Sequence, residues 1–251
     1  MVLSPLDMHR LIDQGVQSMG FFAYQGLDHS EIDLQINHQI DLFIEAVVDK
    51  YYGRELKIGV KEGFQEDVAR LDNLRTLHVK NASVSLTTNP DGSTFPLPTD
   101  YSHHIKTKVI ASYTCVDVTT NVNSGVTKKT ITNTLTNQVR IGESENMENM
   151  RNHPFYKTRK ESPLGEIANN IIQIYTDSSF NITQAFVDYI KKPAVVAYVE
   201  DINGNYDPLN SVTCDLPHTV HRIIVNMTVI AISKIIESNP QKIQNLEKEV
   251  V

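Results

Sequence analysis

The chain has 251 residues, a length that suits one large domain or a core with one inserted lobe. Hydrophobic residues make up 40% of the chain and charged residues 21%, a composition typical of a globular protein with a buried core. The formal net charge of -7 argues against a surface that grips nucleic acid, because clustered Lys and Arg supply most of the affinity for phosphates.

Cys115 and Cys214 lie far apart in the sequence, and neither belongs to a Cys-x-x-Cys pair or lies near a His at metal-ligand spacing. We therefore expect two free, mostly buried thiols in a reducing compartment. The chain opens with no basic segment followed by an apolar run, and no apolar stretch of about 18 residues stands out. These features predict a soluble protein made in the cytoplasm, without a membrane partner.

The first quarter of the sequence predicts helices. In residues 7–19 the apolar side chains recur at helical spacing, and Gly20 ends the pattern. A second and stronger apolar stripe begins near Ser30, which can cap a helix, and ends at Gly53. A shorter helix is predicted over residues 65–77.

The segment from residue 78 to residue 141 is rich in Val, Ile and Thr, which favour strands. Two long runs, 105–120 and 126–141, are separated by a short polar loop and predict a β-hairpin. Pro90 and Gly92 mark a turn before them. The other predicted elements are strands over 79–87, 171–176, 185–190 and 194–199 and a short helix over 143–152.

A last helix is predicted to begin at Leu216-Pro217 and to end at Asn239-Pro240. Its apolar face is broad enough to be buried between other elements. The mostly polar segment that follows carries three apolar residues spaced like anchors, which are Ile243, Leu246 and Val250.

Together these elements predict an α+β protein in which two helical segments enclose a β-rich insertion. Residues 1–77 and 216–238 are expected to form one helical bundle from the N- and C-terminal segments. Residues 78–215 are expected to form an inserted antiparallel β lobe with a short helix near 143–152. Residues 239–251 are expected to form a C-terminal arm.

Motifs that would indicate a metal site or a cofactor site are absent from the sequence. There is no His-Glu-x-x-His, no Cys-x-x-Cys pair and no glycine-rich phosphate loop. The adjacent His103 and His104 would point to opposite faces of a strand. His218 and His221 are spaced to share a helix face, but no third ligand is identifiable, which favours a capping or surface role. We expect no metal and no cofactor.

The remaining sequence patterns also predict no catalysis. Residues 201–207 resemble a calcium-binding loop, but Gly204 and Val212 stand at the wrong positions, which favours an ordinary turn. There is no Gly-x-Ser-x-Gly elbow, and no pair of carboxylates lies in an apolar setting that would raise a pKa. We therefore expect an assembly or binding protein without catalytic residues.

Several short passages, in the same order along nearly the whole chain, carry a resemblance to a known family. They are Glu31-Ile32-Asp33 with Asn37 and Phe43-Ile44; Phe64-Gln65-Glu66-Asp67 with Arg70-Leu71-Asp72-Asn73-Leu74-Arg75; Leu97-Pro98-Thr99-Asp100-Tyr101; His153-Pro154-Phe155; Tyr189-Ile190-Lys191-Lys192-Pro193; and Leu216-Pro217 with His221-Arg222. The chain resembles the head-to-tail connector, or ring, proteins of short-tailed bacteriophages, most of all those of crAss-like phages of Bacteroidetes. Ile223 departs from the family pattern, in which an acidic residue follows the arginine.

The resemblance implies a structural subunit of a connector ring, commonly twelvefold, at the head–tail junction of a virion. The implied partners are further copies of the chain, the portal protein, adjacent tail or ring proteins, and double-stranded DNA that passes through the channel without sequence recognition. The residues that we expect to make assembly contacts are Ile243, Leu246, Val250, His221 and Arg222.

Other functions remain open at this point. One is another virion component, such as a tail-tube or capsid accessory protein. A second is a tail hydrolase of host glycans, which needs two facing carboxylates. A receptor-binding module is less attractive, because the chain has no Trp to form a sugar platform.

Overall fold

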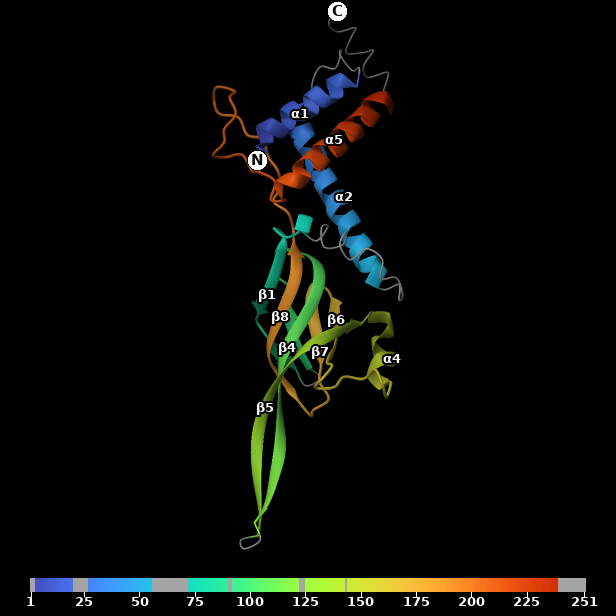
Figure 1. Ribbon diagram of the computed structural model, residues 1–251, viewed down its shortest axis with the longest axis vertical. Coiled ribbons are helices and arrows are strands. Elements are labelled where there is room, and N and C mark those ends of the chain that lie inside the picture. The colour runs from blue at the N-terminus through green and yellow to red at the C-terminus, as the bar shows by residue number, and fades with distance from the viewer. Residues whose placement is uncertain are drawn as a thin grey trace, which may run out of the picture. The chain divides into compact units, whose positions relative to one another are not determined.

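The computed structural model describes residues 3–19, 27–55, 72–89, 92–121, 125–142 and 144–238. The chain forms two compact units, which we describe separately (Figure 1). The helical unit comprises Met1–Leu77 and Pro193–Val251, and the β unit comprises His78–Lys192.

Among the described residues, the helical unit contains three long helices, α1 (Pro5–Ser18), α2 (His29–Glu55) and α5 (His218–Ser238). A capping box starts α1, because Ser4 Oγ accepts the Asp7 N–H and the Asp7 carboxylate accepts the Ser4 N–H, both at 3.2 Å. Pro5 follows in the first turn, where a missing N–H has no cost.

The core of the helical unit lies where α5 packs against both α1 and α2. A Cβ at Gly15 would lie 2.6 Å from Val229 Cγ2, so the glycine allows α1 to approach α5 closely. The apolar residues of this core are Met8, Ile12, Val16, Ile32, Ile36, Ile40, Ile44, Val220, Ile224, Val225, Val229 and Ile232.

By length and composition alone, the stretch His218–Ile236 of α5 is apolar enough to cross a membrane, although no apolar stretch of this length was expected from the sequence. Half of this stretch is buried inside the protein. The core helix of a globular protein has the same properties, so this observation is weak evidence for a membrane span.

The β unit is built on one curled, mixed sheet of eight strands that forms a half-barrel. The strand order is β1-β8-β4-β5-β6-β7-β3-β2. The β5–β6 pair is parallel and the others are antiparallel. The strands are β1 (His78–Val84), β2 (Thr87–Asn89), β3 (Gly92–Pro96), β4 (Tyr101–Asn121), β5 (Gly125–Gly142), β6 (Leu164–Ala168), β7 (Ile171–Tyr175) and β8 (Asn181–Lys191); a 3-10 turn, η1 (Ser144–Asn146), and the helix α4 (Met147–Asn152) follow β5.

The two edge strands of this sheet, β1 and β2, are consecutive in the chain and are separated only by Ser85 and Leu86. The curl of the sheet follows from this short link, because it keeps the two edges close together. The buried residues inside the curl are Phe95, Leu97, Val109, Ala111, Val139, Ile172, Ile174, Phe180, Ile182, Ala185, Val187 and Tyr189.

A β-bulge in β1 is held by a buried carboxylate. Val79 pairs with Tyr189 and Ala82 pairs with Val187, so two residues of β1 lie opposite the single residue Asp188. The Asp188 carboxylate accepts the N–H of Asn81 at 2.6 Å and lies 3.4 Å from Lys106 Nζ. Burial alone would raise the pKa of Asp188, but the Asn81 N–H and the Lys106 ammonium lower it.

The expected helical bundle with an inserted antiparallel β lobe is wrong, because the fold is mostly β and its eight-stranded sheet is mixed. The expectation missed β2, which has three residues, and also β3 and β6. β3 begins at Gly92 and ends at Pro96, and β6 contains Gly165, so both segments read as turns. Without β6, the parallel contact with β5 could not be foreseen, and parallel pairs need long connections that are not visible as a hairpin signal.

The strand expected over residues 194–199 is also absent. Ala197 and Glu200 form only isolated bridges there, with Val212 and Tyr206 respectively. Most of the expected helix over 65–77 lies outside the described residues, and the C-terminal arm over 239–251 lies wholly outside them.

We expect the substitution Asp188→Ala to lower the free energy of unfolding by about 1–3 kcal/mol, because it removes the buried carboxylate that accepts the Asn81 N–H and pairs with Lys106. The pKa of Asp188 is lowered by folding, so its stabilisation is complete above the ordinary carboxyl pKa. That stabilisation is lost as the pH falls through the lowered value. Chemical denaturation at several pH values measures the difference between wild type and variant, which should shrink in acid.

The control for this substitution is Glu161→Ala, since the Glu161 side chain is 61% exposed and lies 3.7 Å from Nζ of the neighbouring Lys160. It should change the stability by less than about 0.5 kcal/mol. Equal stabilities of the two variants at neutral pH would contradict the role assigned to Asp188.

Candidate assembly surface

The most distinctive surface of the β unit is a two-stranded ribbon formed by the distal parts of β4 and β5 (Figure 1). β8 pairs with β4 only from Tyr101 to Ser112, and β6 pairs with β5 only from Arg140 to Gly142. Between these contacts and the tip, the described residues of the two strands pair only with each other. Nine residues of β4 extend past Ser112, which at about 3.4 Å per residue corresponds to roughly 30 Å.

The ribbon carries a row of threonines on one face. Thr130, Thr132, Thr134 and Thr136 alternate along β5 and are all exposed. Thr132 lies opposite the exposed Thr114 of β4, which continues the row across the ribbon. Threonine favours strands, and its hydroxyl and methyl groups form an uncharged surface suited to packing on another sheet.

The base of the ribbon is fixed by a turn that precedes β6. Lys160 Nζ lies 4.2 Å from the centre of the Tyr113 ring, and Asn137 Nδ2 donates a hydrogen bond of 2.6 Å to the Lys160 carbonyl oxygen. The residues Arg159 and Ser162 close this turn by mutual backbone hydrogen bonds. The ribbon therefore begins at a defined point of the sheet.

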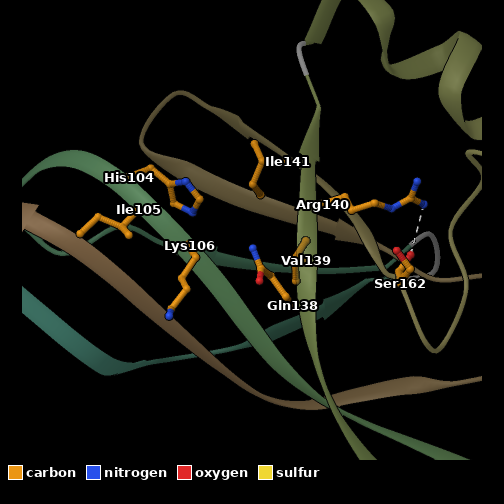
Figure 2. Close-up of a pocket in the computed structure, with 8 residues that line it drawn as sticks. All are labelled: His104, Ile105, Lys106, Gln138, Val139, Arg140, Ile141 and Ser162. Carbon is orange, nitrogen blue, oxygen red and sulfur yellow. Dashed lines mark hydrogen bonds between the residues drawn. The ribbon is translucent and has the colours of Figure 1, made fainter. Parts of the chain in front are cut away.

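A pocket of about 530 Å³ lies at the other end of the β4–β5 pair, where the two strands diverge (Figure 2). Their pairing stops at Thr107 and Val139, beyond which β5 turns to β6 and β4 stays with β8. The lining residues are His104, Ile105, Lys106, Gln138, Val139, Arg140, Ile141 and Ser162.

Polar side chains that line this pocket bind to neighbouring residues of the fold. Its lining contains no carboxylate and no thiol, so it offers no facing pair of carboxylates for glycoside hydrolysis. Burial lowers the pKa of His104 to about 4, and the neutral ring bonds with Thr107 Oγ1 at 2.9 Å. The Lys106 ammonium lies 3.4 Å from Asp188, and Arg140 donates to three backbone carbonyl groups.

In the helical unit, two polar residues of α2 hold the segment that was expected to be a strand. Asn37 Oδ1 accepts the Val196 N–H at 2.8 Å, and its Nδ2 donates to the Val196 carbonyl oxygen at 2.9 Å. One turn earlier, Asp33 accepts the Tyr198 N–H at 2.8 Å and lies 2.8 Å from Nε2 of the buried His9. Side chains thus provide the hydrogen bonds that a neighbouring strand would provide.

Two histidines extend this network. The Nδ1 atoms of His9 and His29 lie 3.1 Å apart, and the Tyr198 ring stacks on both imidazoles. His29 Nε2 lies 3.3 Å from a carboxylate oxygen of Glu200. Within the described part of the chain, no group of three His, Cys, Asp or Glu side chains is arranged to hold a metal ion. The network joins α1, α2 and the loop before α5.

The residues expected to make assembly contacts have different positions. Arg222 is exposed on α5. His221 is fully buried, and its ring bonds with the Leu216 carbonyl oxygen and accepts the Leu3 N–H, so it closes the start of α5 onto the N-terminal segment. The other three, Ile243, Leu246 and Val250, lie outside the described residues.

Sequence reasoning predicted the hairpin but not its projection from the sheet. The alternation of threonines from Thr130 to Thr136 with Ile131, Leu135 and Val139 is the pattern of an ordinary strand with one buried face, so it gave no signal of the projection. The two cysteines are free, with Cys115 exposed on the ribbon and Cys214 buried.

Comparison with known proteins does not assign the chain to a family. No protein-family model matches the sequence, and no curated protein matches it.

We expect the substitution Asn37→Ala to expose the Val196 amide to exchange, because both hydrogen bonds between the two residues are lost. A loss of about 1–3 kcal/mol corresponds to roughly tenfold to a hundredfold faster exchange of that amide. Hydrogen–deuterium exchange measured by NMR gives the rate for each amide. His38→Ala, at an exposed position of the same helix, is the control and should leave Val196 protected; unchanged protection in Asn37→Ala would contradict the role of Asn37.

Proposed function

We propose that this chain is a structural subunit of the head-to-tail connector ring of a short-tailed bacteriophage, bridging portal and tail around the DNA channel without catalysis. The observation that carries the proposal is the β4–β5 ribbon, whose distal part pairs with no third strand among the described residues. The family resemblance of the sequence supplies the identity of the assembly.

An isolated two-stranded ribbon is only marginally stable in water, because it has no core. Both edges of this ribbon present backbone N–H and C=O groups to which another strand can bind. Such a projection gains stability when it packs on a neighbouring subunit, which is why it suits an assembly protein better than a monomeric enzyme. Repeated contacts of one kind between identical subunits produce a ring.

Several residues of the passages that carry the resemblance form structural contacts in the described part of the chain, which supports a structural function. Asp33 and Asn37 hold residues 196–198. Asp100 accepts a hydrogen bond of 2.8 Å from the Tyr189 hydroxyl and accepts the Lys192 N–H through its carbonyl oxygen. These contacts fasten one segment to another.

The charge of the chain suits DNA that slides past it. With a net charge of -7, the subunit as a whole repels the phosphate backbone, so a ring of copies would not trap DNA electrostatically. The threonine row of the ribbon is uncharged and supplies no Arg or Lys contact to phosphates.

We expect the double substitution Thr132→Lys/Thr134→Lys to reduce ring formation at least about tenfold, because two charges would be buried against the neighbouring copy. Both threonines are exposed in the single chain, so the variant should fold normally. Size-exclusion chromatography with light scattering, on the chain alone and with its portal protein, measures the assembly. Negative-stain images distinguish a connector ring from a tail tube or a capsid accessory protein.

The matched control carries the same added charge on exposed residues of the short helical segment, as Ser144→Lys/Asn152→Lys, and should assemble as wild type does. A wild-type chain that stays monomeric with and without portal would refute the proposed function.

A further inference from the structure

Two helices of the helical unit expose stripes of opposite charge. We define the acidic face as the exposed stripe of α2 and the basic face as the exposed stripe of α5. The acidic face consists of Glu31, Leu34, His38, Asp41, Leu42 and Glu45, and the basic face consists of Arg222, Ile223, Asn226, Ile230 and Lys234; all eleven side chains are exposed.

The acidic face combines carboxylates with large apolar side chains. Leu34 is 66% exposed and Leu42 is 40% exposed, while Glu31, Asp41 and Glu45 surround them. At 100° per residue these positions fall within one stripe along the helix. A solvated helix face has no need of leucines, so this composition indicates a surface that another helix covers.

The basic face also combines large apolar side chains with charged ones, but its charges are positive. Ile223 is 43% exposed and Ile230 is 47% exposed, with Arg222 and Lys234 at the two ends of the stripe. No acidic side chain lies among the residues that form it. Ile223 is the position at which the sequence departs from the resembling family, and it adds to the apolar part of this face.

The spacing of the two faces matches. Leu34 and Leu42 are separated along α2 by about 12 Å, and Ile223 and Ile230 along α5 by about 10 Å, at about 1.5 Å per residue. Charged residues flank each apolar pair, over about 21 Å on α2 and about 18 Å on α5. Helices packed side by side would bring apolar pairs together in the middle and opposite charges together toward the ends.

The two faces cannot pair within one chain. α2 and α5 already pack against each other through their buried sides, so their exposed sides are turned away from that contact. Within the described part of the chain no surface covers either face, and we look for the complementary surface on another molecule. A second copy of this chain carries it.

We propose that the basic face of α5 in one copy packs on the acidic face of α2 in the next copy, and that this contact repeats around the ring. The inference rests on the proposed function and names the lateral contact that closes the assembly. Because the two faces differ, the contact is head-to-tail and continues from copy to copy until the ring closes.

Charge reversal tests the pairing. The variant Arg222→Glu/Lys234→Glu makes the basic face acidic, and the variant Asp41→Lys/Glu45→Lys makes the acidic face basic. Each variant alone should assemble at least about tenfold less than wild type, because like charges then meet at every contact. An equimolar mixture of the two variants should assemble again, because every contact between alternating copies then joins opposite charges. Light scattering and negative-stain imaging measure both results, and circular dichroism checks that each variant is folded.

The control variant reverses two cationic residues elsewhere, as Arg75→Glu/Lys157→Glu, and should assemble as wild type does. If wild type forms rings while both variants also form them, or while the mixture fails to recover assembly, the pairing of the two faces is refuted and the proposed function stands. If wild type forms no assembly with or without portal, the proposed function is refuted and the pairing with it.

Discussion

The β unit depends on a single continuous strand that serves two different partners. The first half of β4, Tyr101–Ser112, pairs with β8 and contributes Val109 and Ala111 to the buried interior of the half-barrel. The second half has only β5 as a partner among the described residues. Because no loop separates the two halves, the packing of the core also fixes the direction in which the ribbon leaves the sheet. The core thus positions a surface that has no core of its own.

In the helical unit, side chains of α2 hydrogen-bond to the backbone of the segment before α5. The segment before α5 has backbone groups that need partners, and isolated bridges satisfy only some of them. Asp33 and Asn37 present their carboxylate and carboxamide one helical turn apart, which matches the spacing of the Val196 and Tyr198 amides. A helix can therefore replace an edge strand where two polar residues lie on one face. This explains why Asp33 and Asn37, which belong to the first of the passages quoted for the family resemblance, are four residues apart.

The sequence predicted the elements better than their arrangement. The long helices and the hairpin were foreseeable, since apolar spacing over many residues such as Ile32–Val48 leaves little ambiguity. The sheet order was not, because the glycines and the proline of β3 and β6 read as turns and the β5–β6 contact is parallel. The segment 194–199 looked like a strand from its valines alone, but its hydrogen bonds depend on α2, which lies more than a hundred residues away in sequence. Of the two expected contact residues that the structure describes, Arg222 is exposed and His221 is buried, because tertiary packing decides the burial of His221.

The two proposed contact surfaces differ in what they can specify. The ribbon is uncharged on its threonine face and offers backbone edges, so it can strengthen a contact in more than one register. The acidic and basic faces carry charges at defined positions along two helices, and opposite charges disfavour the pairing of like faces. Orientation in the ring would therefore come from the helices, whereas the ribbon would add area and strand pairing. An assembly needs both a fixed orientation of its subunits and a large contact area. The helix faces would supply the first and the ribbon the second, because neither surface supplies both.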